Sequence, residues 1–120
     1  MTIFSRILHD AVTTIPGAVG GAFAAADGEM VDSYATVDAY EWALLTAHYG
    51  VVMANMQAAF GTWHFGSVQY FVAQHDKYDV LVCDVALGYY ALVVMRPPAP
   101  VRLALQTLRN SVAALRKEIC

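Results

Sequence analysis

The run from Trp42 to His75 contains no Asp, Glu, Lys or Arg over 34 residues, so few arrangements could leave it facing water. Its first part has the pattern of a long helix that begins after Asp38 and ends near Phe60, with Glu41 three residues after the capping Asp38. A helix that lies on one sheet and faces water with its other side shows a broad polar face. This segment has none, so we expect both of its faces to be covered.

The expected helix has two apolar faces of different character. On a helical wheel at about 100° per residue, the large side chains gather on one side and are Trp42, Leu45, Tyr49, Val52, Met53, Met56 and Phe60. The opposite side carries Ala43, Ala47, Gly50, Ala54 and Ala58. One face would pack on the sheet of the same chain. The simplest cover for the other is the same helix of an identical chain across a twofold axis. The alternative is a helix wholly buried inside a monomer, for which a chain of 120 residues offers few layers.

We therefore predict a homodimer, or a heterodimer with a close paralogue. The large-residue side of the helix and one uncharged strand are the expected interface, and its predicted residues are Trp42, Leu45, Tyr49, Val52, Met53, Met56, Gln69 and Phe71. The strand belongs to it because a long uncharged edge strand tends to pair with another chain. The sequence does not decide firmly between the two faces of the helix.

The uncharged run is not expected to span a membrane. A spanning helix needs about 20 mostly apolar residues, and the candidate 42–60 contains Thr46, His48, Asn55 and Gln57. The start of the chain lacks the features of a signal peptide, and the two cysteines form neither a disulfide framework nor a metal motif. We therefore expect a cytoplasmic protein. A net charge of −3 disfavours a general nucleic-acid binder.

The rest of the chain predicts one α+β domain over residues 1–120. Helices are expected at 3–14, 38–60 and 100–119, and strands at 18–26, 29–35, 66–75, 79–86 and 89–95. Short turns within the two groups of strands favour antiparallel neighbours. The strand 89–95 is apolar on both faces and is expected at the centre of the sheet.

The segment 15–23, with sequence IPGAVGGAF, and the Asp27-Gly28 hairpin that follows it resemble the signature of the roadblock / dynein light-chain family. The resemblance covers residues 3–119 and is closest to compact bacterial or archaeal members. It implies a five-stranded antiparallel sheet with the long helix on one face and the two terminal helices on the other. It also implies a dimer formed through the long helix and the third strand. Family members are scaffolds or regulators of Ras-like small GTPases rather than enzymes, and bacterial members act in polarity and gliding motility.

Candidate docking residues lie outside the long helix. Arg102, Arg109 and Arg116 recur at every seventh position of the last helix, and Trp63 and His64 lie in a loop. The arginines form either a solvated helix face or a site for an acidic partner, which could be a small GTPase or another roadblock protein.

Motifs for catalysis or metal binding are not found, so we predict no enzyme activity, no cofactor and no metal. The sequence has no GxxxxGK[ST] loop, no HExxH and no GxSxG. The competing function is a module that senses a small ligand between helix and sheet. Such a site needs convergent polar groups, and Asp84, Tyr89 and Tyr90 are the candidates. Asp84 itself either faces solvent or pairs with a basic residue of the last helix.

Overall fold

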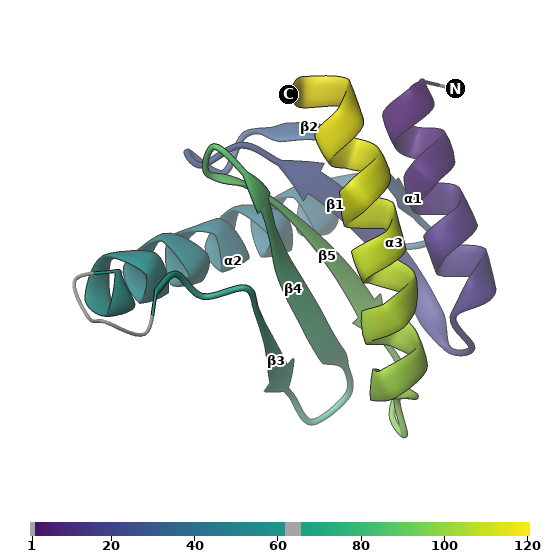
Figure 1. Ribbon diagram of the computed structural model, residues 1–120. Helices are drawn as coiled ribbons and strands as arrows, with labels where there is room; N and C mark the ends of the chain where they lie inside the picture. The colour runs from purple at the N-terminus through teal and green to yellow at the C-terminus, as the bar shows by residue number, and fades with distance from the viewer. Residues whose placement is uncertain (1, 62–65) are drawn as a thin grey trace.

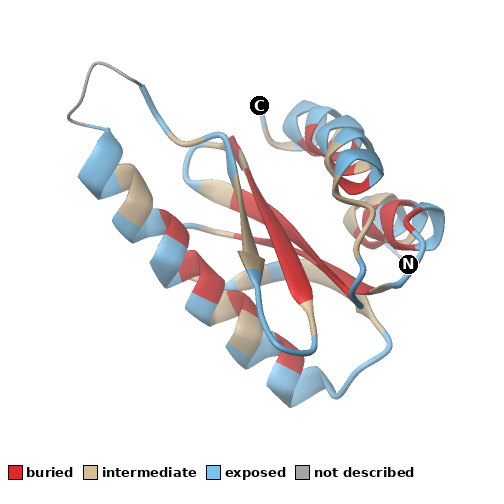
Figure 2. Ribbon diagram, turned by 90° about the horizontal axis from the view of Figure 1, so that it is seen from below, coloured by how far each residue is buried: buried red, intermediate tan, exposed pale blue. Residues whose placement is uncertain are grey.

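One five-stranded antiparallel sheet carries helices on both faces in the computed structural model, which describes residues 2–61 and 66–120 (Figure 1). The elements are α1 (Ile3–Thr14), β1 (Ala18–Ala24), β2 (Met30–Ala35), α2 (Ala39–Phe60), β3 (Tyr70–Gln74), β4 (Asp79–Ala86), β5 (Tyr89–Met95) and α3 (Val101–Ile119). α1 and α3 lie together on one face, and α2 crosses the other (Figures 1 and 2). The predicted α+β fold, with the long helix opposite the two terminal helices, is confirmed.

The strand order is β2-β1-β5-β4-β3. β5 pairs with β1 on one side and β4 on the other, as its two apolar faces predict. β2 and β3 form the two edges of the sheet. β3 is uncharged along its whole length, so the edge that it leaves open has no charged residue to guard it.

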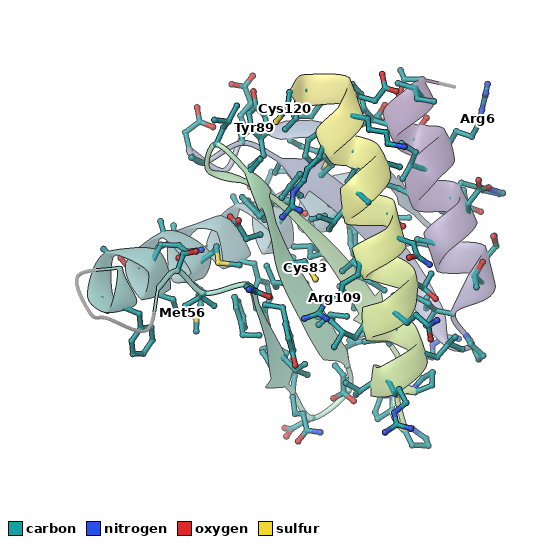
Figure 3. All side chains as sticks on the ribbon, viewed as in Figure 1. Arg6, Met56, Cys83, Tyr89, Arg109 and Cys120 are labelled. Atoms are coloured by element: carbon teal, nitrogen blue, oxygen red, sulfur yellow. The ribbon has the colours of Figure 1, made fainter. Side chains whose placement is uncertain are left out.

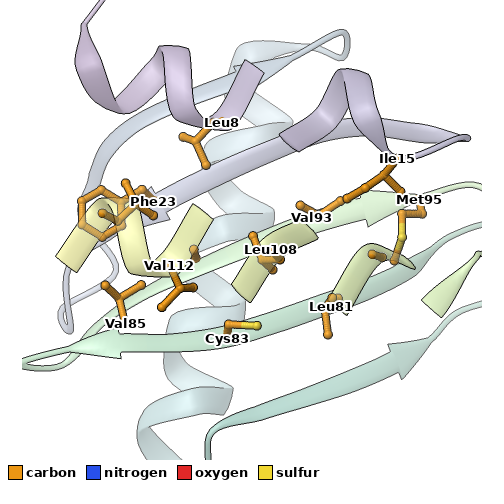
Figure 4. Close-up of a cluster of buried hydrophobic side chains, with 13 residues drawn as sticks. Leu8, Ile15, Phe23, Leu81, Cys83, Val85, Val93, Met95, Leu108 and Val112 are labelled. Atoms are coloured by element: carbon orange, nitrogen blue, oxygen red, sulfur yellow. The ribbon is translucent and has the colours of Figure 1, made fainter. Parts of the chain in front are cut away.

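The face under α1 and α3 holds the larger of the two cores (Figure 4). α3 contributes a stripe of buried side chains at helical spacing, and the stripe consists of Ala104, Leu108, Val112 and Leu115. Phe23 of β1 lies between two aromatic rings, 5.4 Å from Phe4 of α1 and 5.5 Å from Tyr89 of β5. This core fixes both terminal helices on one side of the sheet.

α2 begins after Asp38, whose carboxylate accepts a hydrogen bond of 3.0 Å from the Glu41 backbone N–H, as the sequence predicts. The residues that it buries against the sheet are Trp42, Thr46, Tyr49, Gly50 and Met53. Gly50 therefore faces the sheet together with these larger residues, whereas the helical wheel groups it with the alanines on the opposite side of the helix. The reason is Tyr90 of β5, whose hydroxyl donates a 2.8 Å hydrogen bond to the Thr46 carbonyl and occupies the space beside Gly50.

Gly50→Ala is expected to destabilise the protein. In a solvent-exposed helix the same change stabilises the folded state by about 1 kcal/mol. A methyl group at Gly50 would lie 2.4 Å from the Tyr90 hydroxyl oxygen, so either the helix or the buried Tyr90 side chain must shift. We expect a net loss of about 1–3 kcal/mol in the free energy of unfolding in urea. In a Tyr90→Phe background the loss should shrink, because the obstructing oxygen is gone. A stabilising Gly50→Ala would contradict this packing.

β3 begins at Tyr70 rather than at residue 66, where the sequence predicts its start. The residues just before Tyr70 are held by a side chain of α2. Gln57 of α2 donates from Nε2 to the Val68 carbonyl at 2.8 Å and accepts from the Val68 N–H at 2.9 Å. Gln57 thereby uses both backbone groups that Val68 would offer to a neighbouring strand. Gln69, predicted as an interface residue, therefore precedes β3, and its carbonyl accepts a bond from the Asp84 N–H.

No helix within residues 2–61 and 66–120 combines the length and the hydropathy that crossing a membrane requires.

Candidate functional site

The side of α2 that points away from the sheet is apolar and exposed (Figure 2). Tyr40 is 72% exposed, Val51 59% and Leu44 42%. Between them lie small or uncharged side chains that are also exposed, namely Ala43, Ala54, Asn55 and Ala58. We call this surface, with the three large residues, the outer α2 face. Large apolar residues gathered on one exposed face are typical of a surface that another chain covers.

The structure corrects the choice of helix face. Trp42, Tyr49 and Met53, predicted to meet a second copy, are buried against the sheet of their own chain. Leu45 and Met56 are half-buried at the flank of α2, and Val52 is exposed. Both sides of the helix are apolar, so the wheel separates large from small residues without showing which side meets the sheet. The outward residues Tyr40, Leu44 and Val51 were missed, although each has a wheel position among the outward alanines.

An apolar groove of about 820 Å³ separates α2 from β3. Leu45 and Val52 line it from α2, and Phe71 and Ala73 line it from β3. At its floor Tyr49 stacks on Phe71 with ring centroids 6.1 Å apart, and its hydroxyl forms a hydrogen bond with His75 Nε2. Burial raises the pKa of the Tyr49 hydroxyl above its ordinary value, so the group stays protonated at neutral pH.

The outer α2 face, the groove and the open edge of β3 are neighbours on the molecule. Leu45 and Val52 lie between the outer face and the groove, and Phe71 joins the groove to the edge strand. Backbone groups on an open strand edge can pair with another strand, and an apolar groove can receive a helix. This arrangement is therefore suited to holding a helix and a strand of a second chain.

The predicted docking residues on α3 have different surroundings in the structure. Arg102 is exposed on α3. Arg109 extends from α3 toward β4 (Figure 3), and its guanidinium lies 5.3 Å from the ring centroid of Tyr70 in β3. Arg116 donates from Nε to the Val85 carbonyl of β4. The three arginines therefore do not form one free stripe, because two of them are fixed to the sheet. Trp63 and His64 lie outside the described residues.

The polar groups predicted for a ligand sensor do not converge on one cavity. Tyr90 uses its hydroxyl on the Thr46 carbonyl, and burial, with Asp27 adding to it, raises the Tyr90 pKa to about 12. Tyr89 stacks on Phe23 in the opposite core. Asp84 lies in a separate pocket under α3. Burial raises the pKa of the Asp84 carboxyl and the charge of Arg116 lowers it, although among the described residues Asp84 has no basic group within 4.0 Å. Among the described residues, no three His, Cys, Asp or Glu side chains are grouped so that they could hold a metal ion.

Comparison with solved structures identifies the fold. A roadblock/LC7 domain from Streptomyces avermitilis is 15% identical with a TM-score of 0.88, over 96% of both chains. MglB of Myxococcus xanthus is 11% identical with a TM-score of 0.86, over 99% of this chain and 96% of that one. MglC of Myxococcus xanthus is 19% identical with a TM-score of 0.71, over 96% and 98%. No family model and no curated protein matches the sequence. The chain thus has the roadblock/LC7 fold, as its sequence motifs predict.

Proposed function

We propose that this roadblock/LC7-fold chain works in the cytoplasm as a dimeric, non-enzymatic regulator or adaptor of a small Ras-like GTPase system. The observation that carries the proposal is the outer α2 face, where large apolar side chains stand exposed beside an uncharged, open strand edge. A soluble monomer rarely exposes such a patch without a partner. Self-association has a precedent in the fold, since one MglB structure has a tetrameric arrangement.

We propose that the dimer brings two outer α2 faces together and joins two β3 edges into one sheet. Leu45, Val52 and Phe71, which line the groove, would then be covered by the second copy. The proposed interface uses the same helix and strand that the sequence predicts. On the helix it uses the outward residues in place of those buried against the sheet. A close paralogue with a similar face would serve equally well as the second chain.

The role in GTPase regulation is supported by the fold and by a structural likeness to MglB, one example of which is called a gliding protein in Thermus thermophilus. The test is capture of purified Ras-like GTPases from the same genome, loaded with GDP or with a non-hydrolysable GTP analogue. We expect one GTPase to bind, with a preference for one nucleotide state. GTP hydrolysis measured with and without the chain separates a GTPase-activating partner from an adaptor. Binding of none of these GTPases in either state would contradict the proposal.

A second candidate is supported by the groove, whose volume of about 820 Å³ lies in the range of small-molecule sites. A sensor of an apolar ligand would use Phe71 and Val52 as its walls and the Tyr49–His75 pair as its polar end. A thermal-shift screen distinguishes the two functions. A large ligand-dependent rise in melting temperature without any GTPase binding would favour the sensor.

A further inference from the structure

A second cavity, of about 380 Å³, lies between α3 and the edge of the sheet formed by β3 and β4. We call it the arginine pocket, and its lining residues are Ser67, Gln69, Cys83, Asp84, Arg109, Val112 and Arg116. Unlike the groove beside α2, it is lined mainly by polar side chains. It lies under α3, and none of its residues belongs to α2 or to the outer α2 face.

Two guanidinium groups line this pocket; both arginines are exposed, and each makes one contact with the sheet. Arg109 is fixed by the face of the Tyr70 ring, and Arg116 by the bond from its Nε to the Val85 carbonyl. A guanidinium has five N–H donors. Across the described part of the chain the one ion pair is His9–Asp10, so neither arginine has a carboxylate within 4.0 Å. The terminal nitrogens of both arginines are therefore available to a ligand.

The other lining groups define what else the ligand carries. The Ser67 hydroxyl and the Gln69 amide can each donate or accept a hydrogen bond. Asp84 places one carboxyl in the same cavity and would accept from a donor on the ligand. Burial raises the pKa of the Cys83 thiol to about 11, so Cys83 contributes an uncharged thiol. Two fixed cations and one acid leave the pocket with a positive charge, which favours an anionic ligand.

We propose that the arginine pocket binds an oxyanion, a phosphate or carboxylate group, held by Arg109 and Arg116 on a ligand whose remaining donors face Asp84. Arginine is suited to this role because its planar fork donates two parallel hydrogen bonds to two oxygens. Since both side chains are already held by Tyr70 and Val85, less side-chain freedom is lost on binding. The site is independent of the proposed dimer and of any GTPase.

The test is an NMR titration of the ¹⁵N-labelled protein with inorganic phosphate and, separately, with N-acetyl-glutamate at low salt. We expect saturable shifts of the Gln69 amide and of the Arg109 and Arg116 Nε signals, with dissociation constants of about 1–10 mM for so small a probe. Tighter binding of phosphate would identify a phosphorylated ligand, and tighter binding of N-acetyl-glutamate a carboxylate ligand. No saturable shift with either probe would overturn the proposal.

Three substitutions distinguish specific binding in the arginine pocket from general electrostatic attraction. Arg109→Gln should weaken phosphate or N-acetyl-glutamate binding by about tenfold or more, because a charge-assisted bond is lost. Arg102→Gln removes the same charge from the same helix but outside the pocket, so it should change affinity by less than about twofold at moderate salt. Asp84→Asn should strengthen the binding of inorganic phosphate, because it removes a like charge from beside the anion. Equal losses in Arg102→Gln and Arg109→Gln, or weaker phosphate binding in a folded Asp84→Asn protein, would overturn the proposal.

Discussion

Val51→Asp should convert a self-associated protein into a folded monomer. Val51 is 59% exposed near the middle of the outer α2 face, so a carboxylate there is well hydrated in the free chain. In the proposed dimer the same carboxylate would be buried against an apolar helix without a partner, which costs several kcal/mol. We expect the dimer dissociation constant to rise about 100-fold or more in sedimentation equilibrium. The far-ultraviolet circular dichroism spectrum should stay unchanged.

A matched control exists for this experiment. Leu44, also on the outer α2 face, and Val31 in edge strand β2 are each 42% exposed. Leu44→Asp should weaken self-association as Val51→Asp does, whereas Val31→Asp should leave it intact, because β2 lies at the opposite edge of the sheet from β3. Equal weakening by Val31→Asp would mean that the outer α2 face is not the specific interface.

Met53→Asp, two residues further along the same helix, should unfold the protein. Met53 is 4% exposed and packs between α2 and the sheet with Tyr49 and Val82. An unpaired carboxylate in that core costs several kcal/mol, which is a large part of the 5–15 kcal/mol that holds a domain together. We expect the melting temperature to fall by about 15 °C or more, or the chain to be recovered unfolded. Thermal denaturation followed by circular dichroism measures the effect.

Met53→Leu is the control for this core position. It keeps the volume and the apolar character, so we expect a loss of less than about 1.5 kcal/mol. If Met53→Asp instead gave a stable folded monomer while Val51→Asp unfolded the chain, the two faces of α2 would have been assigned in reverse.

The sequence predicts the elements of this fold well where one periodic pattern decides them. The helix 3–14 and the strands 79–86 and 89–95 match α1, β4 and β5 at both ends, because local spacing and turn residues fix them. The predicted start of β3 was wrong, and the residues before it are held instead by a tertiary contact from Gln57 to Val68. Nothing in the local pattern at residues 66–69 records that contact.

The orientation of α2 could not be predicted from its own residues. Its two sides are both apolar, and the contacts that hold it, such as Tyr90 against Gly50 and Thr46, join residues distant in sequence. The arginines of α3 show the same limit. Their spacing of seven residues indicates a common side of the helix. Only the fold shows that Arg109 contacts the Tyr70 ring and that Arg116 bonds the Val85 carbonyl. Dimer formation and docking to a GTPase remain predictions.

Sedimentation equilibrium of the unmodified chain tests most directly whether the outer α2 face is covered by a second copy. An interface of standard size gives dissociation constants of about 1 µM or tighter. We therefore predict a dimer or higher oligomer at about 100 µM, with dissociation only on strong dilution. A well-folded, soluble monomer at that concentration would contradict the account, because the apolar surface of α2 would then be stable in water alone.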